Sequence, residues 1–216
     1  MPESHSEWHR EVLPDGWARA TNELASRSVL QGFYLAGGTG LALQMGHRRS
    51  VDLDLFSQSE FSPTDLRAQL GDLSGLRVRQ VVRGTIHLEL RDVLVSFLHY
   101  PYPLLFPLHH FEVLTVADPR DIACMKLDAI ASRGSRRDFV GLYVAARRYG
   151  LREILGWFEQ KYAAAPYNRV HLLKALSYFT DAEREPMPDV LVSLAWDTVK
   201  QFFLSEVPRV VSLPGP

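Results

Sequence analysis

The spacing of apolar and polar positions divides the chain into a first part with strand patterns and a second part with helical patterns. Short apolar or alternating runs predict strands at residues 33–36, 51–56, 76–82, 85–90, 93–99 and 112–116. Apolar positions that recur every three or four residues predict helices at residues 15–30, 39–46, 63–73, 119–132, 136–149, 151–163, 168–178 and 190–205. Because every predicted strand precedes residue 118, we expect an α+β protein. A mixed sheet with flanking helices over residues 1–117 would be followed by a helical bundle over residues 118–216 that closes a cleft.

Residues typical of helix starts support several of these boundaries. Ser62 stands before Pro63, and Asp118 stands before Pro119, so each pair joins a capping side chain to a proline in the first turn. Ser135 is expected to cap the helix that begins at residue 136. The periodicity and the caps therefore agree on where these helices begin.

Composition sets limits without indicating a function. The chain has 216 residues, 46% of them hydrophobic and 23% charged, which is ordinary for a globular protein. Its formal net charge of −1 argues against bulk electrostatic wrapping of nucleic acid but not against a local basic patch. Cys124 is the single cysteine, so no internal disulfide is possible and a reducing compartment is indicated. With neither an apolar signal region nor an unbroken apolar stretch of membrane length, we expect a cytoplasmic protein and no membrane partner.

Candidate chemistry gathers in residues 33–56. The predicted strand at 51–56 carries Asp52 and Asp54, which point to the same face because side chains alternate along a strand. Two neighbouring carboxylates repel each other unless a cation lies between them, and oxygen ligands suit Mg²⁺ or Mn²⁺. The pair is therefore either a metal site or a solvated strand face. Its position between bulky apolar residues favours the metal site.

Gly37, Gly38 and Thr39 lie between the first strand and a short helix. They form either an ordinary strand-to-helix turn or a phosphate cradle, because the start of a helix offers free N–H groups to an anion. With Asp52 and Asp54 downstream we favour the cradle. A phosphate-binding turn followed by a metal-binding strand is the order that a nucleotidyl transfer site needs.

Basic residues supply candidate partners for a triphosphate. The turn His47-Arg48-Arg49 is either a solvated loop or a source of charge-assisted contacts to phosphate, with the arginines favoured over His47. Lys126 lies on an apolar helix stripe, so it either reaches the rim of the core or enters a cleft, and Arg133 follows on the same face. We favour the cleft, where Lys126 and Arg133 would hold the triphosphate.

The Gly-Gly-Thr turn followed by the Asp-x-Asp strand resembles the opening motif of the DNA polymerase β-type nucleotidyltransferase superfamily. Within it the chain resembles the AbiEii/AbiGii-type nucleotidyltransferase toxins, and the likeness continues in DIACMKLDAIASRGSRRDFVGLY (121–143) and HLLKALSYFTDAEREPMPDV (171–190). The resemblance implies a nucleotidyltransferase-type sheet. It also implies Mg²⁺-dependent transfer of a nucleoside monophosphate from a nucleoside triphosphate to an acceptor hydroxyl. An RNA acceptor such as tRNA, and an antitoxin partner, are further implications.

The same resemblance assigns roles in the helical half. It places Lys126 and Asp138 in the active site, where both would face Asp52 and Asp54 across the cleft. Asp138 also has a structural explanation, because an acid in the first turn complements the helix dipole.

Two positions depart from the pattern of the resembled enzymes. Many of them carry a third carboxylate on a later strand, where this chain has Ser96, and Glu89 on the neighbouring strand is a candidate substitute. The family often repeats an acid where this chain has Gly141. These departures are compatible with a non-catalytic protein that binds only a nucleotide or a partner.

The acceptor also stays open on the sequence. A small molecule, such as an antibiotic with a free hydroxyl, fits the near-neutral charge as well as RNA does. A dinucleotide-binding oxidoreductase is disfavoured, because the glycines do not match the Gly-x-Gly-x-x-Gly fingerprint. The sequence indicates neither the base of the nucleotide nor the oligomeric state.

Overall fold

The computed structural model describes residues 8–211 and contains a seven-stranded sheet. Its strands are β1 (Tyr34–Leu35), β2 (Asp52–Ser57), β3 (Leu76–Val82), β4 (Thr85–Leu90), β5 (Val93–His99), β6 (His109–Phe111) and β7 (Leu114–Val116). They lie in the order β3-β4-β5-β2-β1-β7-β6. The sheet is mixed, because β2 runs parallel to β5 and β1 runs parallel to β7 while the other neighbours are antiparallel.

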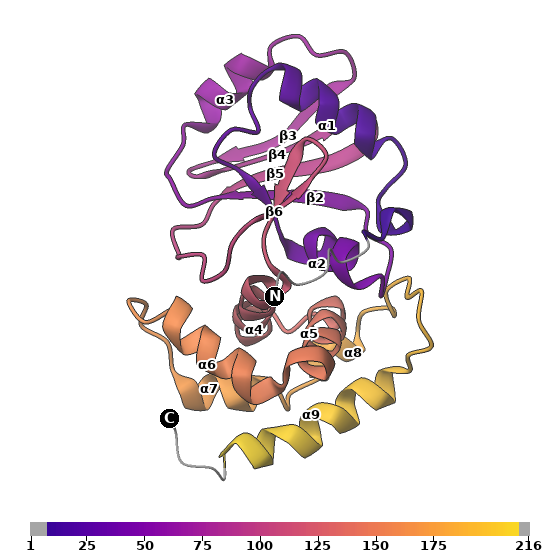
Figure 1. Ribbon diagram of the computed structural model, residues 1–216, viewed down its shortest axis with the longest axis vertical. Helices are drawn as coiled ribbons and strands as arrows, with labels where there is room; N and C mark the ends of the chain where they lie inside the picture. Colours follow the sequence, from indigo (N-terminus) through magenta and orange to yellow (C-terminus); the bar gives the residue numbers. More distant parts are fainter. Residues whose placement is uncertain (1–7, 212–216) are drawn as a thin grey trace, which may run out of the picture.

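Helices cover both faces of this sheet. The helices of the described residues are η1 (Arg10–Val12), α1 (Trp17–Ser26), α2 (Gly37–Met45), α3 (Pro63–Leu70), α4 (Pro119–Ser132), α5 (Arg136–Tyr149), α6 (Leu151–Lys161), α7 (Arg169–Ala175), α8 (Thr180–Glu183) and α9 (Trp196–Val211). α1 and α3 cover one face, whereas α2 lies on the other face against α4 and α5 of the helical half (Figure 1). Among the described residues, no helix is long and apolar enough to cross a membrane.

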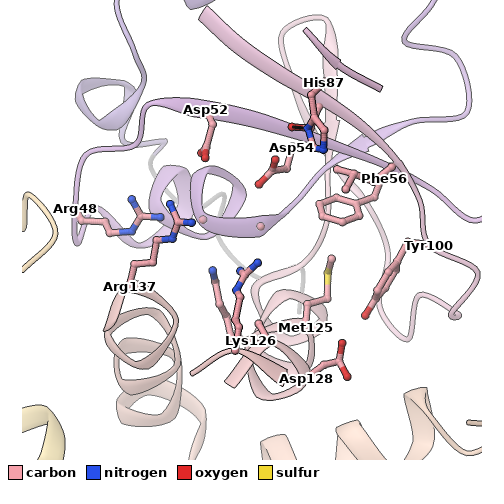
Figure 2. Close-up of a pocket in the computed structure, with 16 residues that line it drawn as sticks. Arg48, Asp52, Asp54, Phe56, His87, Tyr100, Met125, Lys126, Asp128 and Arg137 are labelled. Carbon is pink, nitrogen blue, oxygen red and sulfur yellow. Dashed lines mark hydrogen bonds between the residues drawn. The ribbon is translucent and has the colours of Figure 1, made fainter. Parts of the chain in front are cut away.

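Alternation along β2 explains why one face of the sheet is free for a site. Leu53 and Leu55 are buried in the core that also contains Leu24 of α1. Asp52 and Asp54 alternate with these leucines along the strand and point to the opposite face, toward the helical half (Figure 2). The strand thus contributes its apolar side to the core and its acidic side to the space between the two halves.

The helical half has a core of its own, centred on the fully buried Phe139 of α5 and Phe203 of α9. A smaller cluster joins the two halves. It consists of the buried residues Tyr34, Ala36, Leu41, Ala117, Ile122 and Met125. This cluster holds α4 against the open face of the sheet, and α4 therefore forms the second wall of the space beside β2.

The structure confirms the predicted α+β class and mixed sheet, and several elements have the predicted bounds. The strands at 76–82, 85–90 and 93–99 and the helices at 119–132 and 136–149 begin and end as expected. Alternation and caps were strong in these segments, so their local pattern and their tertiary environment agree.

The caps behave as predicted at two helices and differ at a third. The Ser62 hydroxyl accepts the N–H of Asp65 at 3.2 Å, and the Asp118 carboxylate accepts the N–H of Arg120 at 2.9 Å. Ser135 makes no side-chain cap. Its hydroxyl donates instead to the carboxylate of a residue in the first turn of α5, as described below.

Other boundaries were wrong. The helix predicted at 190–205 begins only at Trp196, because residues 189–191 lie beside residues 47–49 and exchange backbone hydrogen bonds with them at 2.8 and 2.9 Å. The strand predicted at 112–116 is the second half of a hairpin formed by β6 and β7. The helix predicted at 15–30 is shorter, and the short α8 was not predicted.

Candidate active site

A cavity of about 390 Å³ lies between the open face of the sheet and helices α4 and α5 (Figure 2). Its lining residues are Gly37, Gly38, Arg48, Asp52, Asp54, Phe56, His87, Ser96, Leu98, Tyr100, Met125, Lys126, Asp128, Ala129, Arg133 and Arg137. Most of the site residues predicted from the sequence are in this set. The exceptions are Thr39, Arg49 and Asp138.

Asp52 and Asp54 form the acidic wall of the cavity. Burial raises the pKa of Asp54 to about 6, and the neighbouring charge of Asp52 adds to the increase. Neither carboxylate forms an ion pair with any residue between 8 and 211. The wall therefore carries two ionisable acids without a directly bonded cation, which is an arrangement that a bound cation would stabilise.

Thr39 supports this wall from behind. Its hydroxyl donates to the backbone carbonyl of Asp52 and lies 2.6 Å from the hydroxyl of Ser50, and the side chain is buried. Ser50 in turn lies 3.3 Å from the Asp52 carboxylate. Thr39 thus holds the start of β2 in place and does not line the cavity, and its contact with a phosphate stays a prediction.

Gly37 and Gly38 line the cavity, but the helix begins at Gly37 instead of after the glycines. A Cβ atom at Gly37, where φ is +62°, would stand 2.8 Å from the Asp54 carboxylate. A Cβ atom at Gly38 would clash with the Arg48 guanidinium. The glycines therefore leave room for an acid and a guanidinium at the N-terminus of α2, where the helix dipole also favours an anion.

The three residues of the basic turn, His47, Arg48 and Arg49, lie in three different environments. Arg48 is buried against the cavity and donates to the carbonyl of Arg49 at 2.7 Å; burial lowers its pKa, and the charge of Asp52 opposes that decrease. Arg49 lies outside this cavity, with an exposed side chain 3.7 Å from Asp189, and its contact with a triphosphate stays a prediction. His47 is buried, and burial lowers its pKa to about 3, so the ring is neutral near pH 7 and carries no charge for phosphate.

Lys126 enters the cavity from α4 and is fixed by Asp138 of α5. Its Nζ lies 2.7 Å from one oxygen of Asp138, while Arg133 Nε and the Ser135 hydroxyl lie 2.9 and 2.6 Å from the other. Burial alone would raise the pKa of Asp138, but Lys126 and Arg133 outweigh it and hold that pKa well below its usual range. Asp138 is fully buried and does not line the cavity. The prediction that Asp138 faces Asp52 and Asp54 is therefore wrong; it lies behind Lys126 and orients it.

Gly141 has a structural explanation. A Cβ atom there would stand 3.3 Å from Leu41 and 3.4 Å from the Lys126 side chain. An acid at this position would crowd the stem of Lys126. The departure from the family pattern thus leaves the space through which this lysine reaches the cavity.

The structure also shows what stands where many of the resembled enzymes carry a third carboxylate. Ser96 of β5 is paired in register with Asp54 and lines the cavity. Glu89 does not line it: Arg79 Nε lies 3.0 Å from its carboxylate, and Arg77 lies 3.7 Å away. Glu89 is therefore held by arginines outside the cavity lining, and the acid that the register places beside Ser96 is Asp54 itself.

Sequence reasoning missed several lining residues. His87 of β4 lies with its Nδ1 2.9 Å from the Ser96 hydroxyl, and Arg137 of α5 adds a cation opposite the acidic wall (Figure 2). Phe56, Met125 and Asp128 form part of the remaining wall. The alternation of β4 was a signal for His87, because Ile86 and Leu88 are buried in the core and the residue between them faces the other way.

Comparison with known proteins agrees with this fold. Over residues 23–213 the chain matches the model of a family described as nucleotidyl transferase AbiEii toxin, type IV toxin–antitoxin system. It is 35% identical over 194 residues to the uncharacterized protein aq_aa25 of Aquifex aeolicus, which covers 87% of this chain and 92% of that protein.

Two solved structures share the fold at low identity. MenT4, a nucleotidyltransferase toxin of Mycobacterium tuberculosis H37Rv, superposes with a TM-score of 0.56 at 13% identity, covering 91% of this chain and 89% of that one. JHP933 of Helicobacter pylori superposes with a TM-score of 0.50 at 12% identity, covering 90% of each chain. The chain belongs to the AbiEii family of nucleotidyltransferase toxins.

Proposed function

We propose that the protein transfers a nucleoside monophosphate from a nucleoside triphosphate to a hydroxyl of RNA, with Mg²⁺ or Mn²⁺ as the cofactor. One observation carries the proposal: a single cavity sets two carboxylates of β2, neither in an ion pair within residues 8–211, opposite cations from α4, α5 and the turn after α2 (Figure 2). A metal-bound triphosphate has this division of charge, with the metal toward acids and the phosphates toward cations.

The residues present fit a divalent cation. Asp52 and Asp54 offer oxygen atoms alone, and within residues 8–211 no group of three or more acidic, histidine or cysteine side chains could enclose a metal. Mg²⁺ is usually held in this way, by one or two carboxylates together with substrate phosphates. When bound, such an ion neutralises charge on the phosphates and draws electrons from the α-phosphorus.

The basic side chains of the cavity differ in how tightly the protein holds them, which suits them to different contacts with the triphosphate. Lys126 is fixed by Asp138, and its side chain is only 7% exposed, so it offers a positioned charge to a leaving pyrophosphate. Arg133 shares Asp138 but has a side chain that is 58% exposed, so it can follow the phosphate chain. Arg48 is held by its own turn beside Gly38. We assign all three to the triphosphate.

A polymeric acceptor is supported by a second cavity of about 590 Å³. It shares Arg48 and Arg137 with the first cavity and adds Arg49, and its lining also contains the acids Asp15, Glu185 and Asp189. Basic side chains that continue from a reactive centre are suited to the backbone of a nucleic acid. The family description as a toxin–antitoxin system supports an antitoxin partner.

The test is transfer of label. The protein is incubated with each of the four α-labelled nucleoside triphosphates, Mg²⁺ and total RNA, and the products are separated by size. We expect label on RNA with at least one triphosphate and none after chelation of the metal. Label only on small molecules would replace the RNA acceptor, and no transfer with any triphosphate would overturn the proposal.

A further inference from the structure

A row of three polar residues crosses the sheet at the cavity. The register pairs Asp54 of β2 with Ser96 of β5 and pairs Ser96 with His87 of β4. Residues directly opposite each other on neighbouring strands share a face, and all three line the cavity. Asp54 and His87 are labelled in Figure 2. His87 therefore stands at the acidic wall, two strands away from the proposed metal site.

One nitrogen of His87 is held in this row and the other is not. The Ser96 oxygen lies 2.9 Å from Nδ1 of His87, and Ser96 is paired in register with Asp54. A serine hydroxyl can accept a hydrogen bond while its own proton turns toward a neighbouring acid, and in this arrangement Nδ1–H of His87 donates to Ser96. In the neutral ring the lone pair is then on Nε2, where no hydrogen bond is made within residues 8–211.

The transfer reaction needs a base at this wall. As the acceptor oxygen forms its bond to the α-phosphorus, it must lose its proton, while the bond from the α-phosphorus to the bridging oxygen breaks and pyrophosphate leaves with that electron pair. Asp52 and Asp54 are assigned to the cation, and Glu89 is held by two arginines outside the cavity. His87 has a free lone pair beside the position where the resembled enzymes carry a third acid.

We propose that His87, held by Ser96, is the base that takes the proton from the acceptor hydroxyl; this inference rests on the proposed transfer function. Nε2 receives the proton, and Ser96 keeps the ring oriented through Nδ1. The chain thus replaces a carboxylate on β5 by a serine and a histidine on adjacent strands. The histidine is a catalytic residue in this proposal, and the serine is a positioning residue.

His87→Asn is the informative variant, because its amide N–H takes the place of Nδ1–H toward Ser96 while nothing replaces Nε2. We expect an unchanged melting temperature and an unchanged KM for the triphosphate. The kcat for transfer to total RNA should fall by about 10²- to 10⁴-fold, the usual contribution of a positioned base. His110→Asn, at an exposed position of β6, is the matched control and should transfer as the wild type does.

His87→Ala provides a second, independent readout. Added imidazole should restore part of its transfer rate, because a free imidazole can occupy the space of the lost ring. A purely structural role predicts the reverse: full activity in His87→Asn and no response to imidazole in His87→Ala, and either result would overturn the role of His87. A wild type that transfers no label to RNA would instead overturn the proposed function, and the assignment of His87 with it.

Discussion

Replacing Asp54 with asparagine should stabilise the protein without nucleotide while it abolishes transfer. The pKa of Asp54 is about 6 in the folded protein and has its ordinary value of 3.8 when the chain is unfolded. The ionised carboxylate is therefore less favourable in the folded state, so stability decreases as the pH rises from about 4 to about 6 and stays reduced above that. Asparagine is not subject to this penalty, because it does not ionise.

The magnitude follows from the size of the shift. A difference of roughly 2 pKa units corresponds to about 3 kcal/mol. Because Asp54 opens onto a cavity that solvent can enter, screening should reduce this to about 1–2 kcal/mol. For a protein of this length the gain corresponds to a rise of about 2–8 °C in melting temperature.

The measurement is a set of thermal melts at several pH values between 4.5 and 8, with chelator and without nucleotide. The stability gain of Asp54→Asn should be clearly smaller at pH 4.5, where the wild-type carboxyl is still protonated in the folded state, than above pH 7, where it reaches its full size. Asp72→Asn is the control, because that carboxylate is 99% exposed and its ion pair should contribute little. Two results would show that the ionised Asp54 does not destabilise the fold. The variant could be no more stable than the wild type at pH 8, or its stability gain could be the same at pH 4.5 and at pH 8.

Further predictions concern the cations. Lys126→Met should weaken binding of a triphosphate by about one to two decades and destabilise the fold by about 3–5 kcal/mol, because the buried Asp138 loses a partner. Lys126→Met with Asp138→Asn should recover stability but not affinity, as melts and calorimetry would show, and recovered affinity would mean that Lys126 only packs. Arg48→Met should weaken triphosphate binding about tenfold, whereas Arg49→Met should not; equal losses would contradict the separation of the two arginines. Gly38→Ala should mimic Arg48→Met by displacing the guanidinium, and a variant that binds normally would oppose that account of the glycine.

Local sequence patterns predicted most of the helices and strands. Strands β4 and β5 alternate along most of their length and β3 alternates in its first half, while α4 and α5 combine apolar stripes with recognisable starts. Predicted element boundaries were wrong where the backbone forms hydrogen bonds with a segment distant in sequence, as it does at residues 189–191. Nothing in the sequence around Asp189 indicates that its carbonyl accepts the N–H of Arg49.

The site could be predicted only as far as spacing within one segment determines geometry. Asp52 and Asp54 share a face because they belong to one strand, and Lys126 reaches the cleft from an apolar stripe. The burial of Asp138 and the pairing of Ser96 with His87 depend instead on helix packing and strand register. Such relations are set by the tertiary structure, so sequence reasoning assigned Asp138 to the wrong side of Lys126 and did not find His87.

In the proposed mechanism Asp52 and Asp54 hold the cation of a metal-bound nucleoside triphosphate. The most direct test is the anomalous signal of Mn²⁺ in crystals of the protein grown with Mn²⁺ and a non-hydrolysable analogue of the triphosphate used in transfer. We predict a peak bound by both carboxylates, with the phosphates between it and Lys126, and no such peak in crystals of Asp52→Asn or Asp54→Asn. A Mn²⁺ peak elsewhere in the molecule, with the triphosphate away from this cavity, would contradict the account.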